Sequence, residues 1–148
     1  MRVQFDFVVE VVKMFEASSE IFATVESGDT FADTDIYRFF KKYSNAAIEG
    51  VFLYLADAYG KAAMAPDSTA WADALDAAAK LFEARFRRYD SVICPEPYLN
   101  GGEIIRLLGL TEGPEIGELK ERLIEAQIVG AVTNRSEAAT YIESLRAP

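Results

Sequence analysis

Glycine and proline interrupt an otherwise apolar, helix-favouring stretch from Leu99 to Leu123, LNGGEIIRLLGLTEGPEIGELKERL. Asn100 and Glu103 have the spacing of a capping box, in which each side chain accepts the other residue's backbone N–H. Gly109 stands where a helix end takes the left-handed conformation. Gly113-Pro114 suits the start of another helix, because the first helical position needs no backbone N–H. The stretch therefore predicts two helices joined by a tight connection.

A glycine-rich phosphate loop is the alternative for the same stretch. Gly101-Gly102 lacks the lysine of a P-loop and the three-glycine spacing that follows a strand in a dinucleotide site. Glu103 and Glu112 lie nearby and would repel an anion. Glycines that start and end helices are therefore favoured over a phosphate loop. One candidate phosphate contact remains, at the helix N-terminus beside Gly113.

The rest of the chain also has helical spacing. Val3–Phe15 fits both strand alternation and a helical face, and a helix is favoured because the helical spacing continues to Phe22. Asp33 or Thr34 is expected to cap a helix that runs through Tyr43. The segment Ala46–Lys61 is expected to be a mostly buried helix, with a stripe formed by Ile48, Val51, Phe52, Leu55 and Tyr59.

A long alanine-rich helix is expected from Trp71 to about Val92, ended by Pro95 and Pro97. Its stripe consists of Trp71, Leu75, Ala78, Phe82 and Tyr89. A last helix, capped by Thr133 or Asn134, follows Gly130. We therefore predict an all-α fold of six or seven helices: a bundle-like helical body over 1–94 and a smaller three-helix lobe over 95–148.

Composition excludes several classes of site. The 148 residues contain no histidine and one cysteine, Cys94, so imidazole catalysis, histidine metal sites and thiolate zinc sites are excluded for this chain. The formal net charge of −9 repels nucleic acid unless positive charge is locally concentrated. No apolar run is long enough to cross a membrane and no signal peptide is visible, so a cytoplasmic protein is expected.

Two groups of cations lie beside aromatic residues, and together they are the candidate RNA-phosphate contacts. They are Arg38, Lys41 and Lys42 in one helix and Arg85, Arg87 and Arg88 in another. If the two helices are neighbours, the cations could form one patch that grips phosphates while tyrosines stack on bases. The alternative is two ordinary solvated helix faces. Asp33-Thr34-Asp35 has a magnesium-binding spacing, but its place at a helix start favours a solvated first turn, and no metal site is predicted.

Two segments carry a family resemblance: IYRFFKKYSNAAIEGVFLYLADAYG, and YLNGGEIIRLLGLTEGPEIGELKERLIEAQIVGAVTNRSEAATYI. From about Asp35 to Leu145 the chain resembles the C-terminal helical region of bacterial tRNA nucleotidyltransferase/poly(A) polymerase proteins. Its most specific part runs from the Leu99 glycine pattern to V-T-x-R-x-E-A. Leu55–Gly60, LADAYG, resembles the form of the family that carries a histidine-aspartate phosphohydrolase domain. The first helix would then be a remnant of that preceding domain.

The resemblance implies that catalysis belongs to an N-terminal head whose signature this chain lacks. Arg106 falls one position late after Gly101-Gly102, and no aspartate follows Asp90. Magnesium and nucleoside triphosphates are implied only for that head, so no cofactor is expected in this chain. The implied partners are the 3′ end of tRNA or another RNA, and the catalytic and phosphohydrolase-like domains.

The resemblance leaves two roles open for the helical region. In the first, it is non-catalytic and holds the RNA while the head extends it. In the second, it is a scaffold or homodimerisation module that binds no RNA. That role predicts a contiguous apolar surface, for instance near Phe5 and Phe7.

Overall fold

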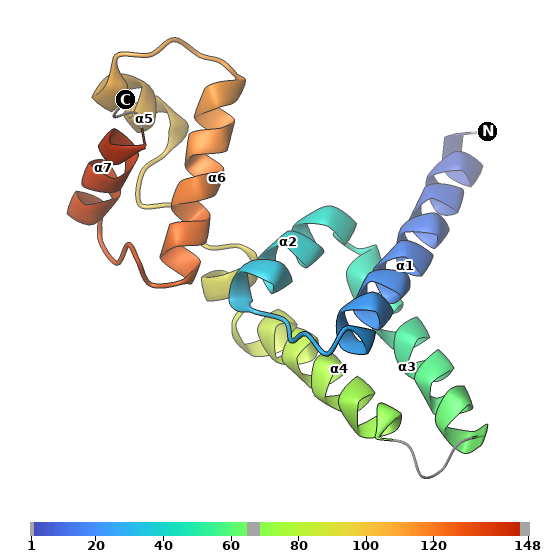
Figure 1. Cartoon of the computed structure of the whole chain (residues 1–148). Coiled ribbons are helices and arrows are strands. Elements are labelled where there is room, and N and C mark those ends of the chain that lie inside the picture. The colour runs from blue at the N-terminus through green and yellow to red at the C-terminus, as the bar shows by residue number, and fades with distance from the viewer. Residues whose placement is uncertain (1, 65–68, 146–148) are drawn as a thin grey trace. The chain divides into compact units, whose positions relative to one another are not determined.

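The structure is a computed structural model that describes residues 2–64 and 69–145, with side chains described from residue 6. Over these residues the chain forms seven α-helices and one π-helical turn, with no strand, which confirms the all-α prediction. The chain divides into two compact units, Met1–Tyr89 and Asp90–Pro148 (Figure 1). The first holds α1 (Arg2–Glu26), α2 (Asp33–Tyr43), α3 (Ala46–Met64) and α4 (Ala70–Arg87). After the π-helical turn Tyr89–Ile93, the second holds α5 (Gly101–Leu108), α6 (Pro114–Ile128) and α7 (Arg135–Ser144).

The first unit is organised around the packing of α1 against α3, the most extensive helix pair in the structure. Gly50 of α3 is buried, and a Cβ placed on it would lie 2.5 Å from the Cβ of Ala17 in α1. The glycine therefore permits the two backbones to approach closely. The ambiguous segment Val3–Phe15 is helical, as predicted, and belongs to α1.

Helix α2 contributes an aromatic cluster to the core of the first unit. The ring of Phe39 packs edge-to-face on Phe31, Phe40 and Tyr43, at centroid distances of 6.1, 5.5 and 5.1 Å. The prediction that Asp33 or Thr34 caps this helix is wrong, because the N-cap of α2 is Ala32. The backbone N–H of Ala32 donates to the Asp35 carboxylate over 3.1 Å. The side chain of Asp35, in the first turn of the helix, therefore satisfies a backbone N–H that has no acceptor within the helix.

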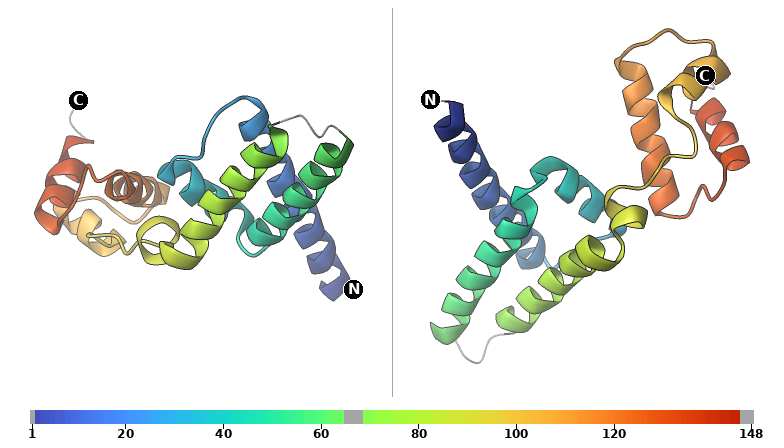
Figure 2. Two further views of the ribbon diagram at one scale, coloured as in Figure 1. Left: turned by 90° about the horizontal axis from the view of Figure 1, so that it is seen from below. Right: turned by 180° about the vertical axis from the view of Figure 1, so that it is seen from behind.

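Helices α3 and α4 form an antiparallel hairpin, visible in both views of Figure 2. Aromatic contacts close it at both ends: Phe52 lies 5.3 Å from Phe82 and Tyr59 lies 5.6 Å from Trp71, between ring centroids. The prediction that α3 is mostly buried is partly wrong, and the stripe expected along the next helix is also only partly buried. Val51 and Ala78 are buried, but four apolar residues on the outer side of the hairpin are exposed, and so is Tyr89 in the turn that follows α4. We call them the apolar band: Phe52, Tyr59, Leu75, Phe86 and Tyr89.

The second unit is a three-helix arrangement around its own apolar core. The glycine and proline signals are confirmed: Asn100 caps α5 in a capping box, Gly109 is left-handed with φ 62°, and Pro114 begins α6. Asn134, one of the two predicted caps, caps α7. The core consists of Leu99, Ile104, Ile116, Leu119, Leu123, Ala126, Val132, Ala138 and Ile142.

Candidate nucleic-acid interface

The three cations of α2 are exposed, but Lys42 is engaged with an acidic residue. Its Nζ lies 2.7 Å from Oε2 of Glu20, and the Tyr43 hydroxyl donates to the same oxygen over 2.7 Å. The hydrogen bond to Glu20, supported by Tyr43, raises the pKa of Lys42 well above its usual value. Lys41 lies over the Tyr37 ring, 5.5 Å from its centroid. Lys42 therefore stabilises the contact between α1 and α2.

Among the cations at the end of α4, Arg88 is bound to a carboxylate, whereas Arg85 lies over aromatic rings. One guanidinium nitrogen of Arg88 donates to both carboxylate oxygens of Asp33, over 2.9 and 2.8 Å. Arg85 instead stacks over exposed rings, 5.0 Å from the centroid of Tyr89 and 5.7 Å from that of Phe86. Arg87 is exposed near the end of the helix. Arg88 thus joins two helices, while Arg85 and Arg87 face solvent.

The Arg88–Asp33 contact also shows how the two cation groups lie relative to each other. It places the end of α4 beside the start of α2. Lys41 and Lys42 lie at the opposite end of α2, about 12 Å further along the axis at ~1.5 Å per residue. Arg38 lies between these ends. The cations of α2 therefore extend along α2 away from Arg88, and the two groups do not form a single tight cluster.

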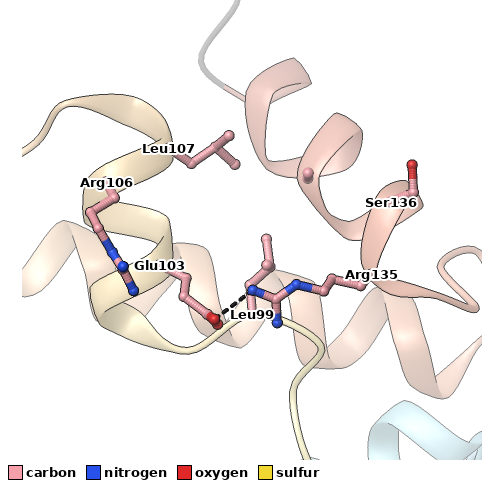
Figure 3. Close-up of a pocket in the computed structure, with 7 residues that line it drawn as sticks. Leu99, Glu103, Arg106, Leu107, Arg135 and Ser136 are labelled. Atoms are coloured by element: carbon pink, nitrogen blue, oxygen red, sulfur yellow. Dashed lines mark hydrogen bonds and ion pairs between the residues drawn. The ribbon is translucent and has the colours of Figure 1, made fainter.

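In the second unit, α5 and α7 enclose an open groove of about 780 Å³ (Figure 3). Two arginines lie along it: Arg106 of α5, whose Nε donates to the carbonyl of Gly102 over 3.2 Å, and Arg135 at the first position of α7. The remaining lining residues are Leu99, Glu103, Leu107, Ser136 and Ala139. We call this site the arginine groove. It combines an apolar floor with guanidinium groups that suit phosphate oxygens.

Both carboxylate oxygens of Glu103 accept hydrogen bonds within the arginine groove. Oε2 accepts the backbone N–H of Asn100 over 2.8 Å, while Oε1 accepts from Nη2 of Arg135 over 2.5 Å. Arg135 also donates to the carbonyl of Tyr98 over 3.2 Å. The hydrogen bond from Arg135, and then that from Asn100, lowers the pKa of the Glu103 carboxyl. A single carboxylate thus caps α5 and orients the arginine of α7.

Sequence reasoning did not select Arg106 and Arg135 as candidate contacts. Arg135 lies in the V-T-x-R-x-E-A pattern, which was the available signal, but its pairing with Glu103 joins positions 32 residues apart. Gly113, the predicted phosphate contact, is the exposed N-cap of α6 and has no side-chain cap. Among residues 2–64 and 69–145, no group of three or more acidic or cysteine side chains could hold a metal ion, and no helix is long and apolar enough to span a membrane.

Comparison with known proteins finds partial relatives. No family model and no solved structure matches the chain. A CC-adding tRNA nucleotidyltransferase of Thermus thermophilus is 42% identical over 59 residues, which cover 37% of this chain and 14% of the relative. An A-adding tRNA nucleotidyltransferase of Deinococcus radiodurans is 43% identical over 49 residues, 33% of this chain and 11% of the relative. The chain thus contains a region similar to short parts of two bacterial tRNA nucleotidyltransferases.

Proposed function

We propose that this chain is a non-catalytic helical region of a tRNA nucleotidyltransferase/poly(A) polymerase-like protein and that it helps to bind and position RNA for 3′-end nucleotide addition. The similarity to two proteins named for adding nucleotides to tRNA carries the proposal. We further propose that the parent protein is cytoplasmic and that it belongs to the form of the family that carries a histidine-aspartate phosphohydrolase domain. Magnesium and nucleoside triphosphates would act in its catalytic head and not in this chain.

The contacts indicate which cations suit this role best. A lysine or arginine already bound to a carboxylate has less to gain from a phosphate, because the phosphate must compete with the existing ion pair. Lys42 and Arg88 are in that position. Arg85 and Arg87 are exposed on the first unit, and Arg106 lies along the arginine groove of the second. We expect these three residues to make the larger contributions.

The test is binding of fluorescently labelled tRNA to the full 148-residue chain across a series of salt concentrations. Each phosphate contact that is removed should lower the salt slope by roughly 0.7–0.9. Arg106→Ala and the double variant Arg85→Ala/Arg87→Ala should both weaken binding. Arg122→Ala, an exposed arginine of α6 outside the groove, is the matched control. Absence of tRNA binding at low salt would contradict the proposal.

One observation favours a second candidate, a helical scaffold that packs on other protein surfaces without binding RNA. On α1, large apolar side chains are exposed at Phe7, Val8, Val12 and Phe15. Three of them, Val8, Val12 and Phe15, follow one another at helical spacing on the same side of the helix. The side chain of Phe5, which the sequence also suggested, lies outside the described residues. A scaffold would leave the tRNA-binding assay without signal while a protein partner covers this face.

A further inference from the structure

The apolar band of the α3–α4 hairpin exposes several large aromatic side chains on the first unit. Phe52 is 59% exposed, Tyr59 65% and Phe86 70%. With Leu75, Tyr89 and the partly exposed rings of Trp71 and Phe82, the accessible apolar area is about 600 Å², at roughly 150–250 Å² per aromatic side chain. That is at the upper end of the patches that monomers expose, and such surfaces commonly mark interfaces.

Several charged side chains of the hairpin have partners on the hairpin itself or on α1. Lys61 pairs with Asp57 over 2.7 Å and lies over the Phe22 ring of α1, 4.1 Å from its centroid. Asp73 accepts from the Thr69 hydroxyl over 3.1 Å. Arg85, stacked on Tyr89, lies at one end of the band only. An RNA strand laid along the band would need cations along its whole length, so the band suits an apolar partner better.

We propose that the apolar band is a homodimer interface, in which a second copy of this chain lays its own α3–α4 hairpin on the band. Two such faces would bury about 1,200 Å² together, which reaches the lower limit for specific protein interfaces. Their aromatic centre with few charges has the composition of such an interface. Ala56 and Ala79 are exposed on the same hairpin, and small side chains there let paired helices approach. This inference is independent of the proposed RNA role.

The position of Arg85 favours an antiparallel pairing of the two hairpins. In a parallel pair, the Arg85 and Phe86 ends of both copies would meet, and two guanidinium groups would face each other across an apolar surface. Like charges in such a place oppose association. Antiparallel pairing separates them and places the Phe86 end of one copy beside the Tyr59–Trp71 end of the other.

The first experiment measures the mass of the full chain by sedimentation velocity at concentrations up to about 100 μM. We expect a species of twice 16.4 kDa for the wild type. Phe86→Glu should give a monomer, and so should Tyr59→Glu at the other end of the band. Phe7→Glu is the matched control, because Phe7 is the same residue type with 69% exposure but lies on α1; this variant should remain dimeric. Circular dichroism confirms that each variant is folded.

Three outcomes would overturn the proposal. The wild type could stay monomeric over the whole concentration range. The control Phe7→Glu could abolish the dimer while Phe86→Glu keeps it, which would place the interface on α1. The wild type could dimerise only when tRNA is added, which would make the nucleic acid the occupant. Because mass and tRNA binding are separate measurements, failure here leaves the proposed RNA role testable.

Cross-linking tests the antiparallel arrangement. In a Cys94→Ser background, Tyr59→Cys and Phe86→Cys are prepared as separate chains, since Cys94 is exposed and would otherwise react. On mixing under oxidation, the antiparallel pair predicts a disulfide-linked heterodimer of the two variants. Cross-linking of each variant to itself, without the mixed product, would overturn this arrangement.

Discussion

The two units of this chain differ in how their apolar residues are used. In the second unit, Ile116, Leu119 and Leu123 recur at helical spacing and are buried, and the helix ends lie at the predicted caps. In the α3–α4 hairpin of the first unit, residues with equally regular spacing, Phe52 and Tyr59 among them, remain exposed. Regular spacing therefore identifies an apolar face, but it does not say whether that face is covered within the same chain.

The sharpest test of this difference compares one substitution at a buried and an exposed leucine. Leu123→Ala empties part of a closed core and should cost about 2–5 kcal/mol of unfolding free energy. Leu75→Ala removes the same atoms from the apolar band and should cost below about 1 kcal/mol in the monomer. Guanidinium unfolding followed by circular dichroism measures both, and Trp71, the single tryptophan, reports on the first unit. Equal losses would show that the band is covered.

A second test concerns the close approach of α1 and α3. Gly50→Ala places a Cβ 2.5 Å from that of Ala17 and 3.1 Å from the carbonyl oxygen of Met14, so the helices must separate. The expected loss is about 1–3 kcal/mol, larger than the gain in helix propensity of ~1 kcal/mol. Gly60→Ala on the same helix meets no atom within 4 Å and is the control. It should stabilise the chain, and urea unfolding distinguishes the two variants.

A third test concerns the local signals of the second unit. Asn100→Ala removes the acceptor for the Glu103 backbone N–H and should cost about 1 kcal/mol. Asn100→Ser keeps an N-cap oxygen and should recover most of that loss. Thermal unfolding of the two variants measures the difference. Identical unfolding temperatures for Ala and Ser would mean that the cap contributes little and that core packing alone determines where α5 begins.

The smallest expected effect is a pH dependence at Glu103. Its pKa is lowered from the ordinary value of 4.5 in the folded chain, so the folded state holds its proton less tightly than the unfolded state. The stabilisation is thus complete above about pH 4.5 and is lost as pH falls through the lowered pKa. Thermal unfolding of wild type and Glu103→Gln should differ at neutral pH and converge in acid. Glu118→Gln, on the exposed side of α6, is the control.

The sequence by itself determined the helical class and most helix ends of the second unit. Those features depend on contacts within a few residues: the Asn100–Glu103 box, the left-handed Gly109 and the proline start of α6. Their physical causes act locally, so a linear pattern contains them.

Only the tertiary structure decided how the charged and aromatic residues are used. Lys42 and Arg88 bind Glu20 and Asp33, which lie 22 and 55 residues away, and Arg135 binds Glu103 across the arginine groove. No local rule specifies these partners, because an ion pair depends on which helices become neighbours. The exposure of the apolar band follows from the same cause: α1 and α2 pack on the hairpin's inner side and leave the outer side open.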